Sequence, residues 1–483
     1  MKQDDGAGGT QGSARGLARF RDHDHTQGSL VRSIAILALP AILTSVAAQG
    51  TFQIIELWFL GELGPDAMAA AGSTNQTLRQ IVFLLVLGLT SGSQMLIARS
   101  VGERDDEAAA RVAGQTLVAG ASLWLVATVA GLFFAEPLVR IVTDDPAVVA
   151  LGAAYVRVAF PFLITAIYTQ LITGILAGAG ESTTPMIVGF IGTPLMLFGE
   201  WALGFGKLGL PALGVEGIAW GQGLGSGVGM IMLVAVLLGG RTRIHVKGKD
   251  LRFDAAVFAR LAAVAWQPAL HMIARTSIVV GFMALAGRLG RDVQAAYTIG
   301  LRVEMLPIMI AFPLANACAT MVGQNLGAGS LPRAWASIRV AYLLELALLW
   351  PCALIVFFFR GSIAGTFTDD PAVVALASEY LFYASIVLGF YGLYFASFRA
   401  LQAAGDMVSP MIISVSVAAV GLPAGWWLAT QSGLGATGMW IANMGYAAVN
   451  CALTIGWLWS GRWARRYENA SPASPEARAT SSR

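Results

Sequence analysis

The stretch Ser33–Gly64, SIAILALPAILTSVAAQGTFQIIELWFLGELG, decides the fold class of this 483-residue chain. It holds more consecutive apolar residues than the roughly 20 that an α-helix needs to cross a bilayer. Four polar residues recur along it at helical spacing, namely Ser45, Gln49, Gln53 and Glu56. We therefore predict a membrane-spanning helix with one narrow polar face that ends in a carboxylate.

Glu56 is the residue of this helix that most needs an explanation. An acid at the bilayer centre costs about 2.5–3.5 kcal/mol on insertion scales, and such residues usually face a bundle interior or a water-filled path. Ser45, Gln49 and Gln53 are therefore predicted to line a substrate cavity, and Glu56 is predicted to bind a coupling cation or proton. The alternative is an acid near the helix end that simply reaches interfacial water.

The composition assigns the whole chain to the membrane. It is 56% hydrophobic and 12% charged, whereas a soluble chain is about a quarter charged. The unbroken apolar runs are too long for the strands of a β-barrel. The fold class predicted is an all-α polytopic membrane protein. The three cysteines lie in apolar segments at unrelated spacings, which is neither a metal pattern nor a disulfide framework.

Twelve apolar segments are long enough to be spans. Their predicted limits are residues 33–60, 67–97, 112–134, 152–178, 185–205, 214–239, 257–287, 293–323, 335–359, 377–403, 409–430 and 435–460. Lys and Arg gather after the second, sixth and twelfth spans, and most densely in residues 241–260. The positive-inside rule then places both termini in the cytoplasm.

An internal repeat divides these spans into two halves. TDDPAVVAL occurs at Thr143–Leu151 and again at Thr368–Leu376, and the register continues from Tyr155 to Tyr380. Because each half has six spans, the halves have parallel orientation and an axis along the membrane normal. The repeated Asp-Pro is interpreted as a helix cap followed by a first-turn proline, with a cation-attracting mouth as the alternative.

The predicted domains follow from this repeat. They are a polar cytoplasmic tail at 1–32, a six-helix lobe at 33–240, a basic connector at 241–256, a second six-helix lobe at 257–462 and a disordered cytoplasmic tail at 463–483.

No sequence motif predicts an enzyme. The chain has no phosphate loop of the Walker type and no nucleophile elbow, and its four histidines do not form a ligand pattern. We therefore expect no catalytic residue, no bound metal and no cofactor beyond a coupling ion, H⁺ or Na⁺. The expected partners are an amphipathic small molecule and the lipid bilayer, without nucleic acid, and the chain is expected to be a monomer.

Two further groups of polar residues lie inside predicted spans. Glu200, in the fifth span, is expected at a depth similar to that of Glu56, so that the two acids can share a proton or a cation; the alternative is an interfacial acid beside Trp201. Gln267, His271 and Arg275 follow each other at i, i+4 spacing in the seventh span. These three, with Tyr391 of the tenth span, are predicted to line the substrate cavity.

Several stretches together resemble the multidrug and toxic-compound extrusion (MATE) family of secondary transporters. In the first half they are residues 40–72, the segment ARSVGERDDEAAAR at 98–111 and GFGKLGLPALGVEGIAWG at 204–221. In the second half they are GRLGRDVQAAYTIG at 287–300 and MVGQNLGAGSLPRAWA at 321–336. The resemblance covers most of the chain, and it is the order of the segments and the duplication that make it specific.

The resemblance implies a V-shaped pair of lobes and export driven by inward movement of H⁺ or Na⁺. It places Glu56 at the position of the family's coupling acid and Glu200 at an accompanying position in the fifth helix. Arg275 and Tyr391 stand where some members carry acids of the second half. This departure favours coupling through the first lobe alone, and it puts a strictly cationic substrate range in doubt.

The predicted function is therefore a cation-coupled antiporter of the cell (inner) membrane that exports amphipathic drugs or metabolites. A flippase or exporter of an anionic lipid-linked or organic-anion substrate is the alternative, which Arg275, Arg302 and Arg399 favour if they converge on the cavity. A channel is a third class, against which the two-lobe repeat argues.

Overall fold

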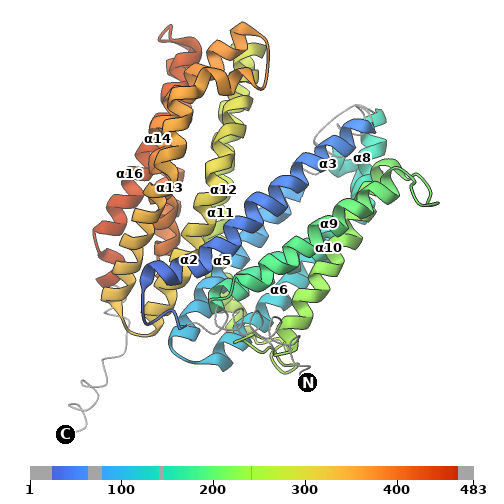
Figure 1. The fold of residues 1–483 in the computed structure, drawn as a ribbon, viewed down its shortest axis with the longest axis vertical. Coiled ribbons are helices and arrows are strands. Elements are labelled where there is room, and N and C mark those ends of the chain that lie inside the picture. The colour runs from blue at the N-terminus through green and yellow to red at the C-terminus, as the bar shows by residue number, and fades with distance from the viewer. Residues whose placement is uncertain (1–23, 64–78, 141–145, 241, 466–483) are drawn as a thin grey trace, which may run out of the picture. The chain divides into compact units, whose positions relative to one another are not determined.

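The computed structural model describes residues 24–63, 79–140, 146–240 and 242–465, and these residues form helices without any strand (Figure 1). Twelve helical segments of this described part are long and apolar enough to cross a membrane. The prediction of an all-α polytopic membrane protein is confirmed.

The chain divides into two compact units, one up to Ala269 and one from Leu270. The division falls inside helix α11 (Ala255–Leu289), whereas the predicted lobes were separated by the connector at 241–256. Unit 1 contains α2 (Leu30–Leu43), η1 (Thr44–Gln49), α3 (Gly50–Glu62), α5 (Gln80–Gly102), α6 (Asp106–Phe133), α7 (Ala135–Arg140), α8 (Pro146–Ala179), α9 (Thr183–Gly204) and α10 (Gly214–Leu238). Unit 2 contains α12 (Arg291–Gly327), α13 (Leu331–Gly365), α14 (Pro371–Ala403), α15 (Val408–Thr430) and α16 (Gly435–Trp459).

Most helices are longer than the apolar runs that predicted them. The span expected at 293–323 is the 37-residue helix α12, and the span expected at 335–359 is the 35-residue helix α13. At 1.5 Å per residue α12 is about 55 Å long, more than the roughly 30 Å of a hydrocarbon core. The extra turns of these two helices contain charged and other polar residues, which end an apolar run but not a helix. The predicted start of the second span at residue 67 lies outside the described residues.

The first residues of the tail predicted at 463–483 are ordered parts of unit 2, and the tail from 466 lies outside the described residues. Residues 462–465 are helical, and the Trp463 side chain is buried with its ring centroid 5.0 Å from that of Trp335. Burial of a large aromatic ring is strongly favourable, so this turn continues the packing of unit 2.

The internal repeat is visible in the helix boundaries. Helices α8 and α14 begin at Pro146 and Pro371, and helices α5 and α12 end at Gly102 and Gly327. In each pair the two positions are separated by the same number of residues as the two copies of TDDPAVVAL. In the second copy the Asp370 side chain accepts a hydrogen bond from the Ala372 backbone N–H (2.9 Å), which confirms the capping interpretation there. The Thr-Asp-Asp of the first copy, residues 143–145, lies outside the described residues.

The first span is not one regular helix. Pro40 lies within α2, where its ring removes a backbone donor. The Thr44 hydroxyl donates to the Pro40 carbonyl (2.9 Å), and a π-helix then runs over Thr44–Gln49 before α3 continues. Such π segments are rare and often mark functional sites. Ser45 and Gln49 of the predicted polar face belong to this segment.

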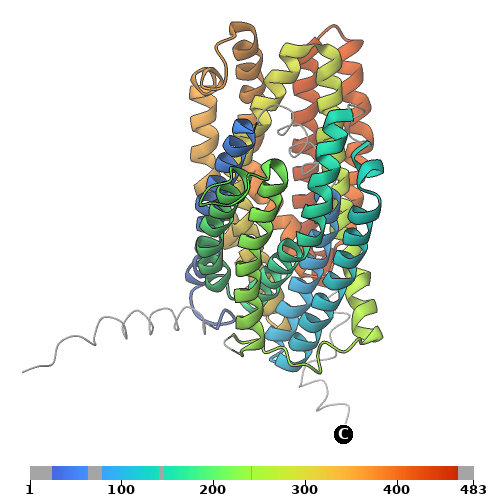
Figure 2. The same cartoon turned by 90° about the vertical axis from the view of Figure 1, so that its right-hand side faces the viewer.

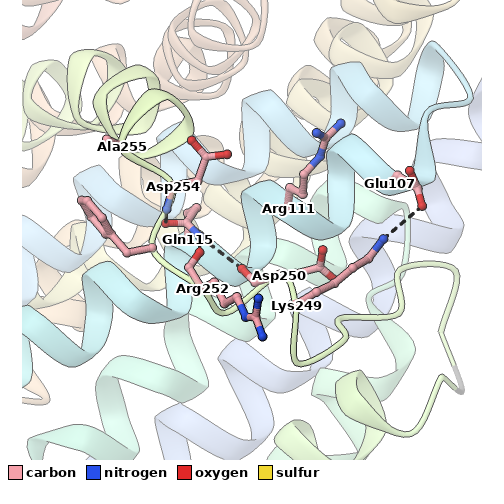
Figure 3. Close-up of a pocket in the computed structure, with 9 residues that line it drawn as sticks. Glu107, Arg111, Gln115, Lys249, Asp250, Arg252, Asp254 and Ala255 are labelled. Atoms are coloured by element: carbon pink, nitrogen blue, oxygen red, sulfur yellow. Dashed lines mark hydrogen bonds and ion pairs between the residues drawn. The ribbon is translucent and has the colours of Figure 1, made fainter.

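The connector between the halves folds back onto the start of α6. The Gln115 amide donates to the carbonyls of Asp250 (3.1 Å) and Arg252 (2.7 Å) and accepts from the Asp254 N–H (3.1 Å), as Figure 3 shows in part. A side chain at Gly114 would collide with the Asp250 carbonyl. The connector is therefore a structured part of unit 1.

A glycine stripe brings α10 against the backbone of α9, and the two helices run side by side (Figure 1, Figure 2). A Cβ at Gly221 would collide with the backbone of Gly199 and Glu200, and one at Gly225 would collide with Met196. This confirms the close packing that small residues in a membrane helix predict. A Cβ added at Gly229 would make only an ordinary van der Waals contact, 3.4 Å from Val188 Cγ1.

We expect Gly221→Ala to lower the stability of the fold, because the added methyl group forces the α9–α10 crossing apart. Overpacking of this kind costs about 1–3 kcal/mol. The measurement is the melting temperature of purified protein in detergent. Gly229→Ala is the matched control on the same helix, and equal melting temperatures for the two variants would contradict the close crossing.

Candidate functional site

The Gln222 side chain of α10 connects an acid and a base in unit 1. Arg79 Nη1 donates to Gln222 Oε1 (3.0 Å), and Gln222 Nε2 donates to Glu56 Oε1 (3.3 Å). A guanidinium group can only donate hydrogen bonds, and an ionised carboxylate can only accept them. The two partners therefore determine which way the amide points.

Packing next to Glu56 explains why α3 meets α10 at this level. Phe59 and Leu60, one turn further along α3, are buried in a small apolar core with Tyr155 of α8 and with Val215 and Ile218 of α10. Because residues three and four apart share a helix face, this anchoring directs Glu56 toward the same two helices. The site is thus formed by several elements of unit 1 (Figure 1).

Glu200 of α9 is the second acid of the network. Its side chain has 0% exposure, and among the described residues neither carboxylate oxygen has a hydrogen-bond partner. Glu56 and Arg79 both lie within electrostatic range of it, as they do of the buried Tyr155. The structure therefore brings the two predicted acids together. A buried anion without a partner costs several kcal/mol, so a bound proton or cation stabilises this arrangement.

The remaining residues of the predicted polar face surround this network only in part. Ser45 is half-buried, as is Glu56, whereas Gln49 and Gln53 are exposed. Arg79, Gln222 and Tyr155 were missed as site residues in the sequence. Arg79 lies inside the span predicted at 67–97, but it was not singled out as an intramembrane charge. Gln222 lies in a glycine-rich segment and did not form part of a polar stripe.

Unit 2 contains a buried acid of its own. Tyr380 Oη donates to Glu304 Oε1 (2.6 Å), and Asn443 Nδ2 donates to Tyr380 Oη (3.4 Å). All three side chains are buried, and the Tyr297 ring packs edge-on against Tyr380 at 5.5 Å. Arg275 lies within electrostatic range of Glu304.

The two networks occupy repeat-related positions. The offset between the two copies of TDDPAVVAL relates Arg79 to Glu304 and Tyr155 to Tyr380. Helices α10 and α16 begin at Gly214 and Gly435, and the offset between these starts also relates Gln222 to Asn443. The duplicated scaffold thus carries an arginine in one half where it carries a glutamate in the other.

The predicted polar residues of the seventh span have different partners. Gln267 belongs to unit 1 and donates to the Ala263 carbonyl of its own helix (3.2 Å). His271 Nε2 is 3.0 Å from Tyr394 Oη, and its ring stacks on Phe398 at 4.1 Å. The second ring nitrogen of this buried histidine has no hydrogen-bond partner in the described part of the chain.

Arg275 and Tyr391 meet at Phe395 of α14. The guanidinium carbon of Arg275 lies 5.0 Å from the Phe395 ring centroid, a cation–π distance, and the Tyr391 ring lies 6.1 Å from it. Both residues are half-buried, and both are within electrostatic range of Glu304. These two predicted residues therefore belong with the Glu304 network.

The other two arginines named in the sequence differ in burial. Arg399 is buried, donates to Gln402 Oε1 (2.7 Å) and covers the Phe312 ring. The centroids of the Phe312 and Phe395 rings are 6.0 Å apart, so Arg399 and Arg275 cover adjacent rings. Arg302 is exposed.

A cavity of about 490 Å³ lies between α6 and the connector (Figure 3). Its carboxylates already have structural roles: Glu107 pairs with Lys249 (3.2 Å), Asp250 accepts from the Lys247 N–H (2.8 Å) and Asp254 caps α11. The described residues contain no group of three or more His, Cys, Asp or Glu that could hold a metal ion.

Twelve apolar helices in a duplicated arrangement, with ionisable side chains buried among them, define a polytopic membrane protein. A family model described as MatE matches residues 40–201 and 269–427, and the chain therefore belongs to the MATE family of transporters.

The known relatives match this chain over most of their own length. The probable multidrug resistance protein NorM of Thermotoga maritima is 26% identical over 436 residues, which cover 89% of this chain and 92% of that protein. A solved structure of MATE in complex with MaL6 matches with a TM-score of 0.84 at 19% identity, over 92% of this chain and 99% of that one. A solved transporter of the MOP superfamily from Pyrococcus furiosus matches with a TM-score of 0.83 at 20% identity, over 90% and 96%.

Gln222→Leu is expected to destabilise unit 1, because the half-buried Glu56 carboxylate loses the hydrogen bond that Gln222 donates to it. Leaving such a group unsatisfied costs about 1–3 kcal/mol. The melting temperature in detergent should fall accordingly. Gln431→Leu, at an exposed position after α15, is the control, and an equal effect of the two substitutions would remove the bridging role.

Proposed function

We propose that this chain is a secondary antiporter that exports amphipathic small molecules in exchange for inward H⁺ or Na⁺. The observation that carries the proposal is the pairing of Glu56 with the fully buried Glu200 inside an apolar helical unit. Two carboxyl groups in one such site provide a place for a single positive charge to bind and leave. The names of the multidrug resistance relatives support a small-molecule substrate.

In the proposed cycle the binding and release of a cation at this site change the free-energy difference between the open and closed states of unit 1. The ion enters from outside and neutralises one carboxylate of the Glu56–Glu200 pair. The less charged site tolerates a drier environment, so the helices close around it and the substrate leaves to the exterior. Release of the ion to the cytoplasm restores the charge and reopens the cavity for the next substrate.

The driving force is sufficient for useful export. One charge moving through a membrane potential of about 150 mV contributes about 3.5 kcal/mol. This corresponds to about a 300-fold substrate gradient. We further propose that the protein is a monomer of the cell membrane with both termini in the cytoplasm, since the Lys- and Arg-rich links then lie inside.

Export of an anionic lipid-linked or organic-anion substrate is the second candidate. The Pyrococcus furiosus structure is described as having a binding pocket of reverse polarity that suggests a different function. In this chain Arg275 and Arg399 cover the adjacent rings of Phe395 and Phe312, which supports this candidate. The two acids of unit 1 and the names of the multidrug resistance relatives favour the first candidate.

Glu56→Gln is expected to abolish gradient-driven export by purified protein in liposomes, because the amide keeps the shape of the side chain and loses its titration. Glu56→Asp should retain partial activity, since the carboxylate moves by only one methylene group. Glu200→Gln should weaken export less severely or shift its pH dependence. The measurement is efflux of a fluorescent amphipathic cation under an imposed gradient.

Glu62→Gln is the matched control, because Glu62 is an exposed acid at the end of the same helix α3. Its rate should equal that of the wild type. Wild-type rates from Glu56→Gln would remove Glu56 from the coupling mechanism.

Glu304→Gln tests whether unit 2 couples instead. A glutamine at this position still accepts the Tyr380 hydrogen bond, so we expect export at a rate near that of the wild type. Loss of export in Glu304→Gln combined with normal export in Glu56→Gln would assign coupling to unit 2.

A further inference from the structure

We propose that Arg79 is a built-in cation that excludes Na⁺ from the Glu56 site, so that the coupling ion of this transporter is H⁺. This inference rests on the proposed antiport and adds the identity of the ion to it. It is carried by the geometry of three side chains, Glu56, Gln222 and Arg79.

A Na⁺ site needs several oxygen atoms that converge on one point, as sites for hard cations do. Next to Glu56, Gln222 contributes its N–H group, which donates to the carboxylate at 3.3 Å. The amide oxygen is turned away and accepts from Arg79 at 3.0 Å. The Gln222 oxygen is therefore directed at Arg79 and is not available to a cation beside the Glu56 carboxylate.

The orientation of this amide is held at both ends. If the Gln222 amide were reversed, its NH₂ group would face the Arg79 donors and its oxygen would face the Glu56 carboxylate. Both contacts would then be repulsive, because a guanidinium has no acceptor and a carboxylate has no donor. Na⁺ cannot recruit the Gln222 oxygen without breaking the bond to Arg79.

The charge of Arg79 acts in the same direction. It lies within electrostatic range of Glu56 and of Glu200, so a metal cation bound by either acid is repelled by a fixed positive charge. The other titratable group that faces these acids is the buried Tyr155 of α8. The network of described residues thus contains two acids and one permanent cation. With both acids ionised its net charge is one negative charge, which the exchanged ion neutralises.

A proton fits the same site without a coordination shell. Transfer from hydronium to Glu56 forms one O–H bond and leaves a water molecule. The protonated carboxyl group keeps an acceptor oxygen for the Gln222 N–H, so the bridge to Arg79 remains intact. The proton changes the charge of the site but not its hydrogen-bonding framework.

The repeat shows that the scaffold itself does not demand an arginine here. The repeat-related position in the second half is Glu304, which takes part in a buried network with Tyr380 and Asn443. The same place in the duplicated fold therefore accommodates a charge of either sign. The positive charge of Arg79 belongs to the chemistry of the unit 1 site.

The test uses the full-length protein in liposomes, with ethidium as the transported probe and the membrane potential clamped by an ionophore. For the wild type, a pH gradient without Na⁺ should drive export, and a Na⁺ gradient at equal pH should not. Adding Na⁺ to both sides of the pH-driven assay should change the rate by less than about twofold, the scale of an ionic-strength effect.

Arg79→Gln should make the pH-driven rate sensitive to Na⁺, with an affinity for Na⁺ that is higher by about tenfold or more, because a fixed charge one amide group away is removed. Arg79→Lys keeps the charge and should stay insensitive. Arg157→Gln removes an exposed arginine of the same unit that pairs with Glu136, and it serves as the matched control.

Export by the wild type under a Na⁺ gradient alone would overturn the inference and leave the antiport itself standing. An Arg79→Gln protein that exports but remains insensitive to Na⁺ would overturn it as well. If that variant does not fold, competition by Na⁺ against pH-driven export in the wild type decides the question. Failure of both gradients to drive export would instead contradict the proposed function.

Discussion

The hydrogen bonds of the Gln222 amide are the interaction on which the site of unit 1 depends. One amide bonds a half-buried acid from α3 and a base at the start of α5, and its neighbour Gly221 lies where α10 packs directly against α9. That close approach requires Gly221 and Gly225, since any side chain there would collide with the α9 backbone. Polar groups in a hydrocarbon environment need partners within the protein, so the helix crossing and the network are one structural feature.

The duplicated scaffold carries two networks with their charges exchanged. In unit 1 the acid Glu56 comes from the first span and Arg79 from the second. In unit 2 Arg275 comes from the seventh span and the acid Glu304 from the eighth. Each unit therefore balances an acid with a base inside the membrane, which lowers the cost of keeping either charge there. Each unit also has a further buried acid, Glu200 in unit 1 and Glu345 in unit 2, whose carboxylate oxygens have no hydrogen-bond partner among the described residues. The difference between the units is that Glu200 lies within electrostatic range of the acid Glu56 and of Arg79.

Much of the fold was predictable because its signals are local or periodic. Each span is an apolar run, and the repeat of TDDPAVVAL predicts helices whose ends recur at the same offset in both halves. The limits of α12 and α13 were predicted too short, because their end turns contain polar residues and hydropathy alone does not extend a helix into water. The π-helix at Thr44–Gln49 was not predicted, since it arises from how Pro40 and Thr44 rearrange the backbone bonds.

The sequence by itself determined the class of protein, the family and the two acids Glu56 and Glu200, since an acid inside an apolar run is conspicuous and costly. It did not determine their partners. Arg79 lies within the predicted second span without a polar stripe around it, and Gln222 lies among glycines, so the local sequence indicates no partner for either. Only the tertiary structure decided that these two side chains meet Glu56, because hydrogen bonds between residues so distant in the chain depend on how the helices pack and not on the order of the sequence.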